Sequence, residues 1–294
     1  MSASAAVHPA LRVTCWGTRG SIPAPGPATV RYGGNTSCIE INSASGCRLI
    51  FDAGTGIRAL SLGLAAETEP LDAHLFVTHY HWDHIQGFPF LSQLYQPDTR
   101  LRIHGPGQGD MSVEQALSGQ MSPIYFPVPL EAMAAAVEFS TIDGTHWEDD
   151  GVRVDAFRVN HPGVTYGYRV SADGATAVYV PDNELGDTPD PAWYREMVAF
   201  TAGADLLLHD AMLTEEEYAR RRGWGHTSFG QAVRLAEDAG VRRLALFHHS
   251  PDRSDQELDE ILAGLRGSLA ARGSSLVVDV ADEGTDIELG SAAS

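Results

Sequence analysis

The sequence predicts a mixed α/β fold, and its pattern of apolar residues is the main indication. Short runs rich in β-branched and aromatic residues alternate along the chain with segments whose apolar residues repeat at helical spacing. The chain has 294 residues, of which 43% are hydrophobic, so it can bury one large core or two smaller ones without disulfides. We therefore expect one domain of two similar halves over residues 11–289, with a flexible N-terminus at 1–10 and a frayed tail at 290–294.

The expected strands are short apolar runs bounded by turn-forming residues. In chain order they are residues 11–16, 37–41, 48–51, 73–78, 101–104, 152–159, 166–170, 177–180, 205–208, 244–247 and 276–280. The expected helices are residues 57–62, 85–95, 191–200, 214–222, 228–239 and 255–271. The last helix has the clearest signals, because Ser254 and Glu257 form a capping box and Gly273 can end it. Prolines interrupt the stretch 105–150, which we expect to be looser and to contain lid or loop segments over one face.

Cysteine usage and the absence of targeting signals indicate the compartment. Cys15, Cys38 and Cys47 form no Cys-x-x-Cys pair and lie among strand-like segments, as is typical of buried thiols in a reducing compartment. Residues 1–10 lack the cationic start and apolar stretch of a signal peptide, and no apolar run approaches the length of a membrane span. We expect a cytoplasmic protein with no membrane partner.

The charge balance restricts the substrate. Acidic residues outnumber basic ones by 39 to 20, which gives a formal net charge of −19. Nucleic-acid binders depend on an excess of lysine and arginine, so we expect no long nucleic acid as a partner. Bound divalent ions would cancel part of the negative charge locally, and a small anionic substrate remains compatible with this composition.

A dense group of metal-ligand side chains follows the expected strand at 73–78. The sequence there reads T-H-Y-H-W-D-H from Thr78 to His84. His79 and His81 are two residues apart and point the same way on an extended segment, whereas Asp83 and His84 follow where the chain turns into a helix. Two pairs of ligands can therefore face two ions, and neutral imidazole and carboxylate are ligands that zinc, manganese and iron accept. The alternative is a solvated histidine-rich turn.

Three further ligand candidates each follow a later expected strand. His161 precedes Pro162 and Gly163, Asp182 follows an apolar strand and Pro181, and His248 follows the strand at 244–247. Ligand types that recur at strand ends predict one site at one edge of the sheets.

The order His-x-His-x-Asp-His, followed by His, Asp and His after successive strands, resembles the metallo-β-lactamase fold. The resemblance covers nearly the whole chain, from Cys15 to His248. It implies an αββα sandwich of two mixed β-sheets flanked by helices, with a dinuclear metal site at one edge. It also implies two divalent ions, zinc first, with manganese or iron as alternatives, and a homodimer. The implied ligands are His79, His81 and His161 for the first metal and Asp83, His84 and His248 for the second, with Asp182 bridging the two.

Several motifs are similar to one branch of that family, ribonuclease Z and its small-molecule phosphodiesterase relatives. The closing segment reads G-H-T-S-F-G-Q-A from Gly225 to Ala232, and its histidine, His226, is implied to lie near the leaving group. Ribonuclease Z usually inserts a long basic arm for transfer RNA between the ligands corresponding to His161 and Asp182, and the short segment here leaves no room for one.

We therefore expect a dinuclear metal-dependent hydrolase, a phosphodiesterase for small cyclic nucleotides. In this hypothesis a hydroxide that bridges the metals attacks phosphorus, Asp83 orients or deprotonates the water, and His226 protonates the leaving oxygen. Hydrolysis of a thioester, lactone or β-lactam is the alternative, because the same site attacks carbonyl carbon. A transfer-RNA 3′ endonuclease and a non-enzymatic, metal-stabilised interaction protein are the remaining interpretations.

Other residues keep two interpretations each. His226 can be only a neighbour of a helix cap. His209 and Asp210 can orient a ligand imidazole or merely fix nearby backbone. The glycine-rich turn after Asp52 resembles a phosphate loop but lacks its lysine, so we expect a tight strand-to-helix turn in which Asp52 supports the site from beneath.

Overall fold

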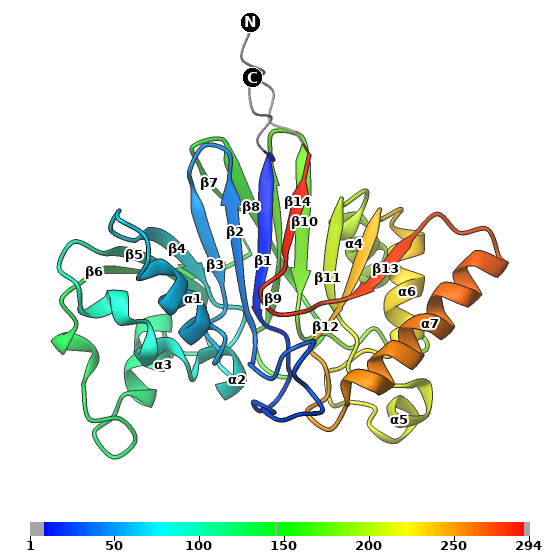
Figure 1. The fold of residues 1–294 in the computed structure, drawn as a ribbon, viewed down its shortest axis with the longest axis horizontal. Helices are drawn as coiled ribbons and strands as arrows, with labels where there is room; N and C mark the ends of the chain where they lie inside the picture. Colours follow the sequence, from blue (N-terminus) through cyan, green and yellow to red (C-terminus); the bar gives the residue numbers. More distant parts are fainter. Residues whose placement is uncertain (1–8, 145, 291–294) are drawn as a thin grey trace, which may run out of the picture.

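Two seven-stranded sheets pack face to face in the computed structural model, which describes residues 9–144 and 146–290 (Figure 1). The first sheet has the order β14 (Asp286–Leu289), β1 (Leu11–Gly17), β2 (Cys38–Ser43), β3 (Arg48–Phe51), β4 (Asp72–Phe76), β5 (Arg100–Pro106) and β6 (Ala136–Ile142). The second has the order β13 (Val277–Val280), β12 (Arg243–Phe247), β11 (Leu206–Asp210), β10 (Ala175–Val180), β9 (Tyr166–Ala172), β8 (Val152–Arg158) and β7 (His146–Asp149). Both sheets mix parallel and antiparallel pairs.

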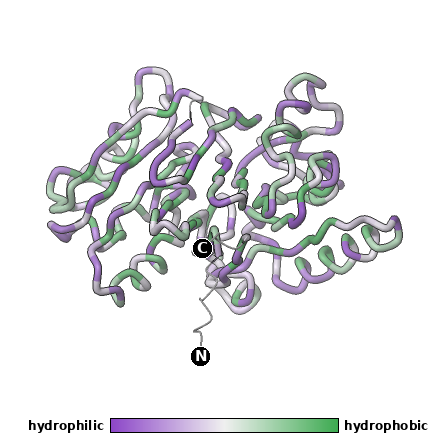
Figure 2. The backbone as a smooth tube through the Cα atoms, turned by 90° about the horizontal axis from the view of Figure 1, so that it is seen from above, coloured by the Kyte–Doolittle hydropathy of each residue, from purple (hydrophilic) through white to green (hydrophobic). Residues whose placement is uncertain are grey.

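Helices cover the outer face of each sheet, so the predicted αββα sandwich is confirmed (Figure 1). The first sheet carries α1 (Ile57–Leu64), α2 (Trp82–Ile85) and α3 (Val113–Gln120). The second carries α4 (Pro191–Thr201), α5 (Glu215–Arg220), α6 (Phe229–Asp238) and α7 (Asp255–Ala271). In Figure 2, α7 alternates between hydrophilic and hydrophobic colours, because it packs one face on the sheet through Leu258 and Leu269. None of the helices in the described ranges is long and apolar enough to cross a membrane.

Aromatic side chains fill the space between the two sheets. Phe51 is fully buried, and its ring centroid lies 5.3 Å from that of Phe76, 5.5 Å from Tyr168 and 6.0 Å from Tyr179. Phe51 and Phe76 come from the first sheet, whereas the two tyrosines come from the second. This layer therefore joins the sheets directly above the edge where the ligand-bearing segments emerge.

The sequence-based prediction of one helix over residues 85–95 is wrong. The α-helix starts earlier, at Trp82, and ends at Ile85, and two short 3₁₀ helices follow, Phe88–Phe90 and Ser92–Tyr95. Gly87 and Pro89 explain the break, since proline cannot continue a helix and Gly87 packs against the preceding turn. A Cβ atom on Gly87 would lie 2.0 Å from the carbonyl oxygen of Gly54, so the chain must turn at this glycine.

The stretch 105–150, which was expected to contain lid or loop segments, is more regular than predicted. This stretch contains the end of β5, α3, a 3₁₀ turn at Leu130–Ala132, β6 and β7. Helix α3 begins with a capping box formed by Ser112 and Gln115, which sequence reading overlooked. Strand β6 escaped detection because it is an edge strand with no fully buried residue.

The chain ends behave only partly as expected. Residues 1–8 and 291–294, which include most of the predicted flexible N-terminus and frayed tail, lie outside the described residues. Ala10 is buried, however, and its amide donates a hydrogen bond to the Leu289 carbonyl at 3.0 Å. Strand β1 begins at Leu11, as predicted, although the buried Ala10 before it was assigned to the flexible N-terminus, and β14, which was not predicted, pairs with β1 at the edge of the sheet.

We expect Phe51→Ala to lower the free energy of unfolding by about 3–5 kcal/mol, because it leaves a cavity in the aromatic layer between the sheets. Urea unfolding of metal-free protein measures this change. The matched control is Leu62→Ala on α1, where the side chain is 60% exposed and the change should stay within about 0.5 kcal/mol. Equal midpoints for the two variants would show that the aromatic layer does not stabilise the sandwich.

Candidate metal centre

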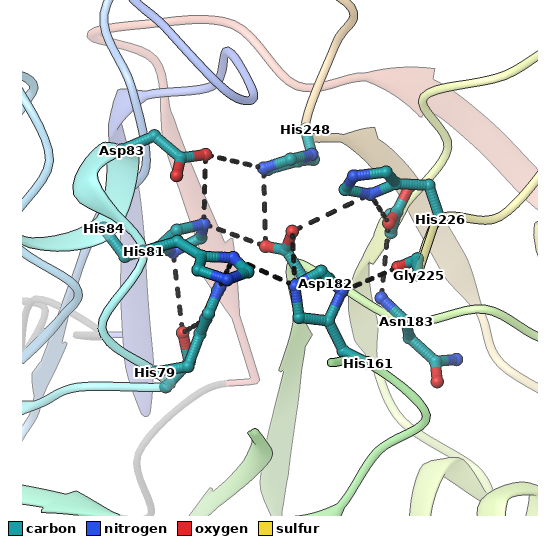
Figure 3. A network of polar contacts seen from close by, with 12 residues as sticks. His79, His81, Asp83, His84, His161, Asp182, Asn183, Gly225, His226 and His248 are labelled. Atoms are coloured by element: carbon teal, nitrogen blue, oxygen red, sulfur yellow. Dashed lines mark hydrogen bonds and ion pairs between the residues drawn. The ribbon is translucent and has the colours of Figure 1, made fainter. Parts of the chain in front are cut away.

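The candidate ligands lie at the edge of the sandwich where several strands of both sheets end (Figures 1 and 3). The first four follow β4: His79 and His81 precede α2, and Asp83 and His84 lie within it. His81 is the N-cap residue of α2, with an extended backbone, so the chain turns sharply between His81 and Asp83. His161 follows β8, Asp182 follows β10 and His248 follows β12.

The structure brings three imidazoles together as the first predicted ligand set. The Nδ1 atom of His81 lies 3.0 Å from Nε2 of His79 and 3.2 Å from Nε2 of His161. Zinc–nitrogen bonds of about 2.0–2.1 Å in tetrahedral geometry place ligand nitrogens roughly 3.3 Å apart. The three nitrogens therefore have the spacing of one metal coordination sphere.

The second predicted set is also brought together. The Oδ2 atom of Asp83 lies 3.3 Å from Nε2 of His84 and 3.2 Å from Nε2 of His248. All three side chains are buried. His248 has a positive φ of 58°, an unfavourable backbone conformation for a side chain other than glycine that is common at functional sites.

Asp182 lies between the two sets (Figure 3). Its Oδ2 atom is 2.9 Å from Nε2 of His84 and 3.4 Å from Nε2 of His248. Its Oδ1 atom is 3.9 Å from Nε2 of His161. One carboxylate oxygen therefore faces each set, which is the arrangement that a bridging ligand requires.

The donor atoms fit divalent cations. Within the described part of the chain, Nε2 of His84 and Oδ2 of Asp182 are buried and form no hydrogen bond of acceptable geometry, although they face one another. A metal ion would satisfy both atoms. Nitrogen and carboxylate oxygen donors in this mixture suit zinc, manganese and iron.

The electrostatic field of the site also favours bound cations. Burial lowers the pKa of His79 well below its ordinary value, which keeps that ring in the neutral form that binds metals. Burial acts against the charged form of His84 as well, but Asp83 and Asp182 outweigh it and raise the pKa of His84 well above its ordinary value. A positive charge is thus stabilised between these carboxylates, and a metal ion would supply it.

Asp52 holds one ligand from below. Its carboxylate is fully buried and accepts hydrogen bonds from Nδ1 of His84 at 2.8 Å, the Thr78 amide at 2.8 Å and the Tyr179 hydroxyl at 2.9 Å. The bond to Nδ1 leaves Nε2 of His84 free to face the centre. The expected supporting role of Asp52 agrees with these contacts.

A backbone carbonyl fixes the ring of His161 in the same way. Nδ1 of His161 donates a hydrogen bond to the Gly225 carbonyl at 3.0 Å. A Cβ atom on Gly225 would lie 2.2 Å from Nδ1 of His161, so only glycine permits this close approach.

His226 lies close to the N-cap of α6, and it also lies beside the centre. The N-cap of α6 is Ser228, whose hydroxyl accepts from the Gln231 amide. Nδ1 of His226 donates to Oδ2 of Asp210 at 2.8 Å and lies 3.7 Å from Oδ1 of Asp182. Burial disfavours the charged ring, but Asp210 outweighs burial and raises the pKa of His226 to about 9. A cation bound nearby would oppose this shift by repulsion.

The two interpretations of His209 and Asp210 are resolved by their contacts. Asp210 orients His226 and also accepts a hydrogen bond from the Met212 amide at 3.0 Å. His209 contacts no candidate ligand: its Nδ1 donates to the Asp210 carbonyl at 2.7 Å, and its Nε2 lies 3.3 Å from the Asn183 amide nitrogen. Asp210 is therefore a site residue, whereas His209 fixes backbone.

Glu184 was missed by sequence reading. This buried carboxylate accepts from the Tyr218 hydroxyl at 3.0 Å and from the amides of Gly223 and Gly225, both at 2.9 Å. It therefore holds the loop that carries His226. Apart from its place two residues after Asp182, no sequence signal distinguishes Glu184 from the solvated acidic residues that dominate this chain.

The early loop supports the second ligand set. The Ser21 amide donates to Oδ2 of Asp83 at 2.7 Å, with Ser21 at a positive φ of 65°. Arg19 is completely buried and donates to the carbonyls of Gly33 and Ser250 at 2.7 and 3.0 Å, so it locks the loop and cannot meet a substrate.

An open cavity of about 480 Å³ leads to the centre, within the range of small-molecule sites. Its walls are Ser21, Tyr80, His81, Trp82, Asp83, Asp182, His226 and His248. The candidate ligands thus have a solvent-accessible face, as a catalytic metal site needs and a structural one does not.

Comparison with known proteins identifies the class. The family described as "Beta-lactamase superfamily domain" matches residues 47–249, and the chain belongs to this superfamily. Together with the two-sheet sandwich, this defines a hydrolase of the metallo-β-lactamase fold.

Relatives and solved structures extend this assignment. Ribonuclease Z of Haloferax volcanii is 29% identical over 286 residues, which covers 82% of this chain and 84% of the relative. The metallo-β-lactamase fold protein YhfI of Bacillus subtilis has a TM-score of 0.69 at 22% identity, covering 95% of this chain and 98% of that protein. A diphosphatase of the PhnP family also has a TM-score of 0.69, at 17% identity, covering 97% of this chain and all of that protein. The chain is thus similar to ribonuclease Z in sequence and shares the fold of both structures.

We expect Asp52→Asn to weaken metal binding about 10- to 100-fold, because an amide no longer holds Nδ1 of His84 as a carboxylate does. Asparagine tolerates the positive φ of 61° at this position, so the backbone should be retained. Competition with a chromogenic chelator measures the affinity. The control is Asp150→Asn, an exposed aspartate that also has a positive φ, and it should leave the affinity unchanged. Equal affinities for both variants would show that Asp52 does not support the metal.

Proposed function

We propose that the protein is a metal-dependent phosphodiesterase that acts on small, cyclic nucleotide phosphodiesters. The observation that carries this proposal is the pairing of His226 with Asp210 beside the two candidate ligand sets, at the end of a small open cavity. A protonated imidazole placed next to a dinuclear centre suits the departure of an alkoxide, which needs a proton.

The connection between His161 and Asp182 supports a small substrate. Strands β9 and β10 pair antiparallel with Ala172 opposite Ala175, so only Asp173 and Gly174 form the turn. Both turn residues have positive φ values, 48° and 79°, as in the tight two-residue hairpin turn. The long arm expected of a transfer-RNA processing enzyme is therefore absent between these residues, and the net charge of −19 opposes polyanion binding as well.

The residues of the chain have distinct tasks in this proposal. Two divalent cations held by the candidate ligands would lower the pKa of a coordinated water and neutralise charge on the phosphodiester. Asp83 is held at Oδ2 by the Ser21 amide, so its Oδ1 can accept a hydrogen bond from the attacking water. His226 is held at Nδ1 by Asp210, so its Nε2 can donate a proton to the leaving oxygen.

The ribonuclease Z relatives favour one second candidate, an RNA endonuclease. The chemistry at phosphorus would be the same, and only the substrate would differ. Cleavage of a precursor transfer RNA by this protein at a rate above that of every small diester would replace the proposal with this one.

The first test is turnover of a panel of 3′,5′- and 2′,3′-cyclic mononucleotides by protein reconstituted with zinc or manganese. We expect hydrolysis of at least one ring and loss of turnover in Asp83→Ala beyond what its reduced metal content explains. A thioester and a precursor transfer RNA serve as the competing substrates. A fully metallated Asp83→Ala protein with near-normal turnover would contradict the role of Asp83, and faster thioester hydrolysis would contradict the phosphodiesterase.

His226→Ala should keep its metal content and lose about 10²- to 10⁴-fold in kcat for diesters with poor, alkoxide leaving groups. Diesters that release 4-nitrophenolate need little proton donation and should lose much less. Rates across a series of leaving groups, with metal content measured in parallel, test this expectation. The control is His146→Ala, an exposed histidine on β7. Equal losses for good and poor leaving groups would exclude proton donation by His226.

A further inference from the structure

We propose that Trp82 is a stacking platform that selects phosphodiesters whose retained ester group carries an aromatic ring, as a nucleoside carries its base. This inference rests on the proposed phosphodiesterase function and extends it to the nucleoside. In a cyclic nucleotide, the nucleoside stays bonded to phosphorus through one oxygen while its other oxygen leaves.

The position of Trp82 is the first argument. It is the first residue of α2, between His81 and Asp83, and its side chain forms part of the cavity wall. It is 76% exposed. Among the large exposed apolar side chains of the described residues, Trp82 is the one that lines this cavity. An indole in water beside the ligands provides a flat apolar surface within reach of a bound substrate.

The backbone around Trp82 is rigid, which is the second argument. Its carbonyl accepts from the Gln86 amide at 2.7 Å, and the His84 carbonyl accepts from the Ala53 amide at 2.7 Å. The side chain of Gln120 in α3 also donates to the Ile85 carbonyl at 3.0 Å. The short helix is thus tied to two neighbouring segments, so a substrate that stacks on Trp82 does not have to order the backbone first.

The charge of the cavity wall is the third argument. None of the wall residues is arginine, and the sequence contains no lysine. The phosphoryl group can be held by the metal centre, but no lysine or arginine lines the cavity to hold a second anionic group of the substrate. The cavity wall therefore offers the rest of the substrate hydrogen-bonding and apolar groups in place of a basic side chain, and the indole supplies the stacking surface.

The positions of Trp82 and His226 on opposite sides of the centre indicate which part of the substrate lies near Trp82. Figure 3 shows His81 and Asp83 on one side of the centre and His226 on the other. Trp82 joins His81 to Asp83 in the chain, so its backbone lies on the side away from His226, and its side chain lines the cavity. The leaving group faces His226, so the group near Trp82 is the one that stays on phosphorus.

The test uses two diesters with the same leaving group, thymidine 5′-(4-nitrophenyl) phosphate and methyl 4-nitrophenyl phosphate. We expect Trp82→Ala to lower kcat/KM for the thymidine diester on the order of 10- to 100-fold and that for the methyl diester by less than about threefold. Trp82→Phe should recover part of the loss, because phenylalanine keeps a stacking face. Tyr125→Ala is the matched control, since Tyr125 is a 73% exposed aromatic residue that does not line the cavity.

Equal losses for the two diesters in Trp82→Ala, or the same selective loss in Tyr125→Ala, would overturn the assignment. Equilibrium binding separates this inference from the proposed function. Thymidine 5′-phosphate should bind the metal-loaded protein more tightly than ribose 5-phosphate, and Trp82→Ala should remove the difference. If thymidine 5′-phosphate binds more tightly but no diester is hydrolysed, only the proposed phosphodiesterase function is refuted. If diesters are hydrolysed but the two phosphates bind equally well, only the stacking role of Trp82 is refuted.

Discussion

The buried carboxylate of Asp52 is the interaction on which this site depends. It lies between the sheets and accepts hydrogen bonds from the Thr78 amide, the Tyr179 hydroxyl and the His84 ring. Tyr179 belongs to the second sheet, whereas Thr78 and His84 flank the turn after β4. A buried carboxylate without hydrogen-bond donors would lower the free energy of unfolding by several kcal/mol. The three donors are therefore needed to keep Asp52 in this place. The same bonds that satisfy Asp52 also aim His84 at the candidate metals.

Close backbone approach is the second constraint. A Cβ atom on Gly20 would lie 2.3 Å from Cε1 of His248, and one on Gly225 would lie 2.2 Å from Nδ1 of His161. Glycine backbone therefore packs directly on two candidate ligand rings and restricts their rotation. The loops before β2 and before α6 thus act as walls of the centre, and the loop at 223–226 is held in turn by Glu184.

The candidate ligands indicate the type of reaction, whereas the residues around the cavity select the substrate. The sequence relatives of this chain include proteins named ribonuclease Z. The solved structures of the same fold include a diphosphatase. A dinuclear site with an open face can serve each of these reactions, so the ligands alone do not select a substrate. Selection depends on what borders the cavity, and here the wall includes the exposed indole of Trp82 and no arginine or lysine.

The sequence by itself determined the elements whose signals are local. The capping box at Ser254 places α7 at the predicted bounds, and ligand types at the ends of apolar runs predict that His79, His161 and His248 converge. Only the tertiary structure decided the rest. Helix α2 ends at Ile85 because Gly87 meets Gly54, and β14 exists because β1 is available to pair with it. The roles of Glu184 and of Asp210 toward His226 depend on contacts between segments 16 to 41 residues apart. Such contacts leave no periodic or local pattern in the chain, and for this reason sequence reading could name the candidate ligands but not all of the residues that hold them.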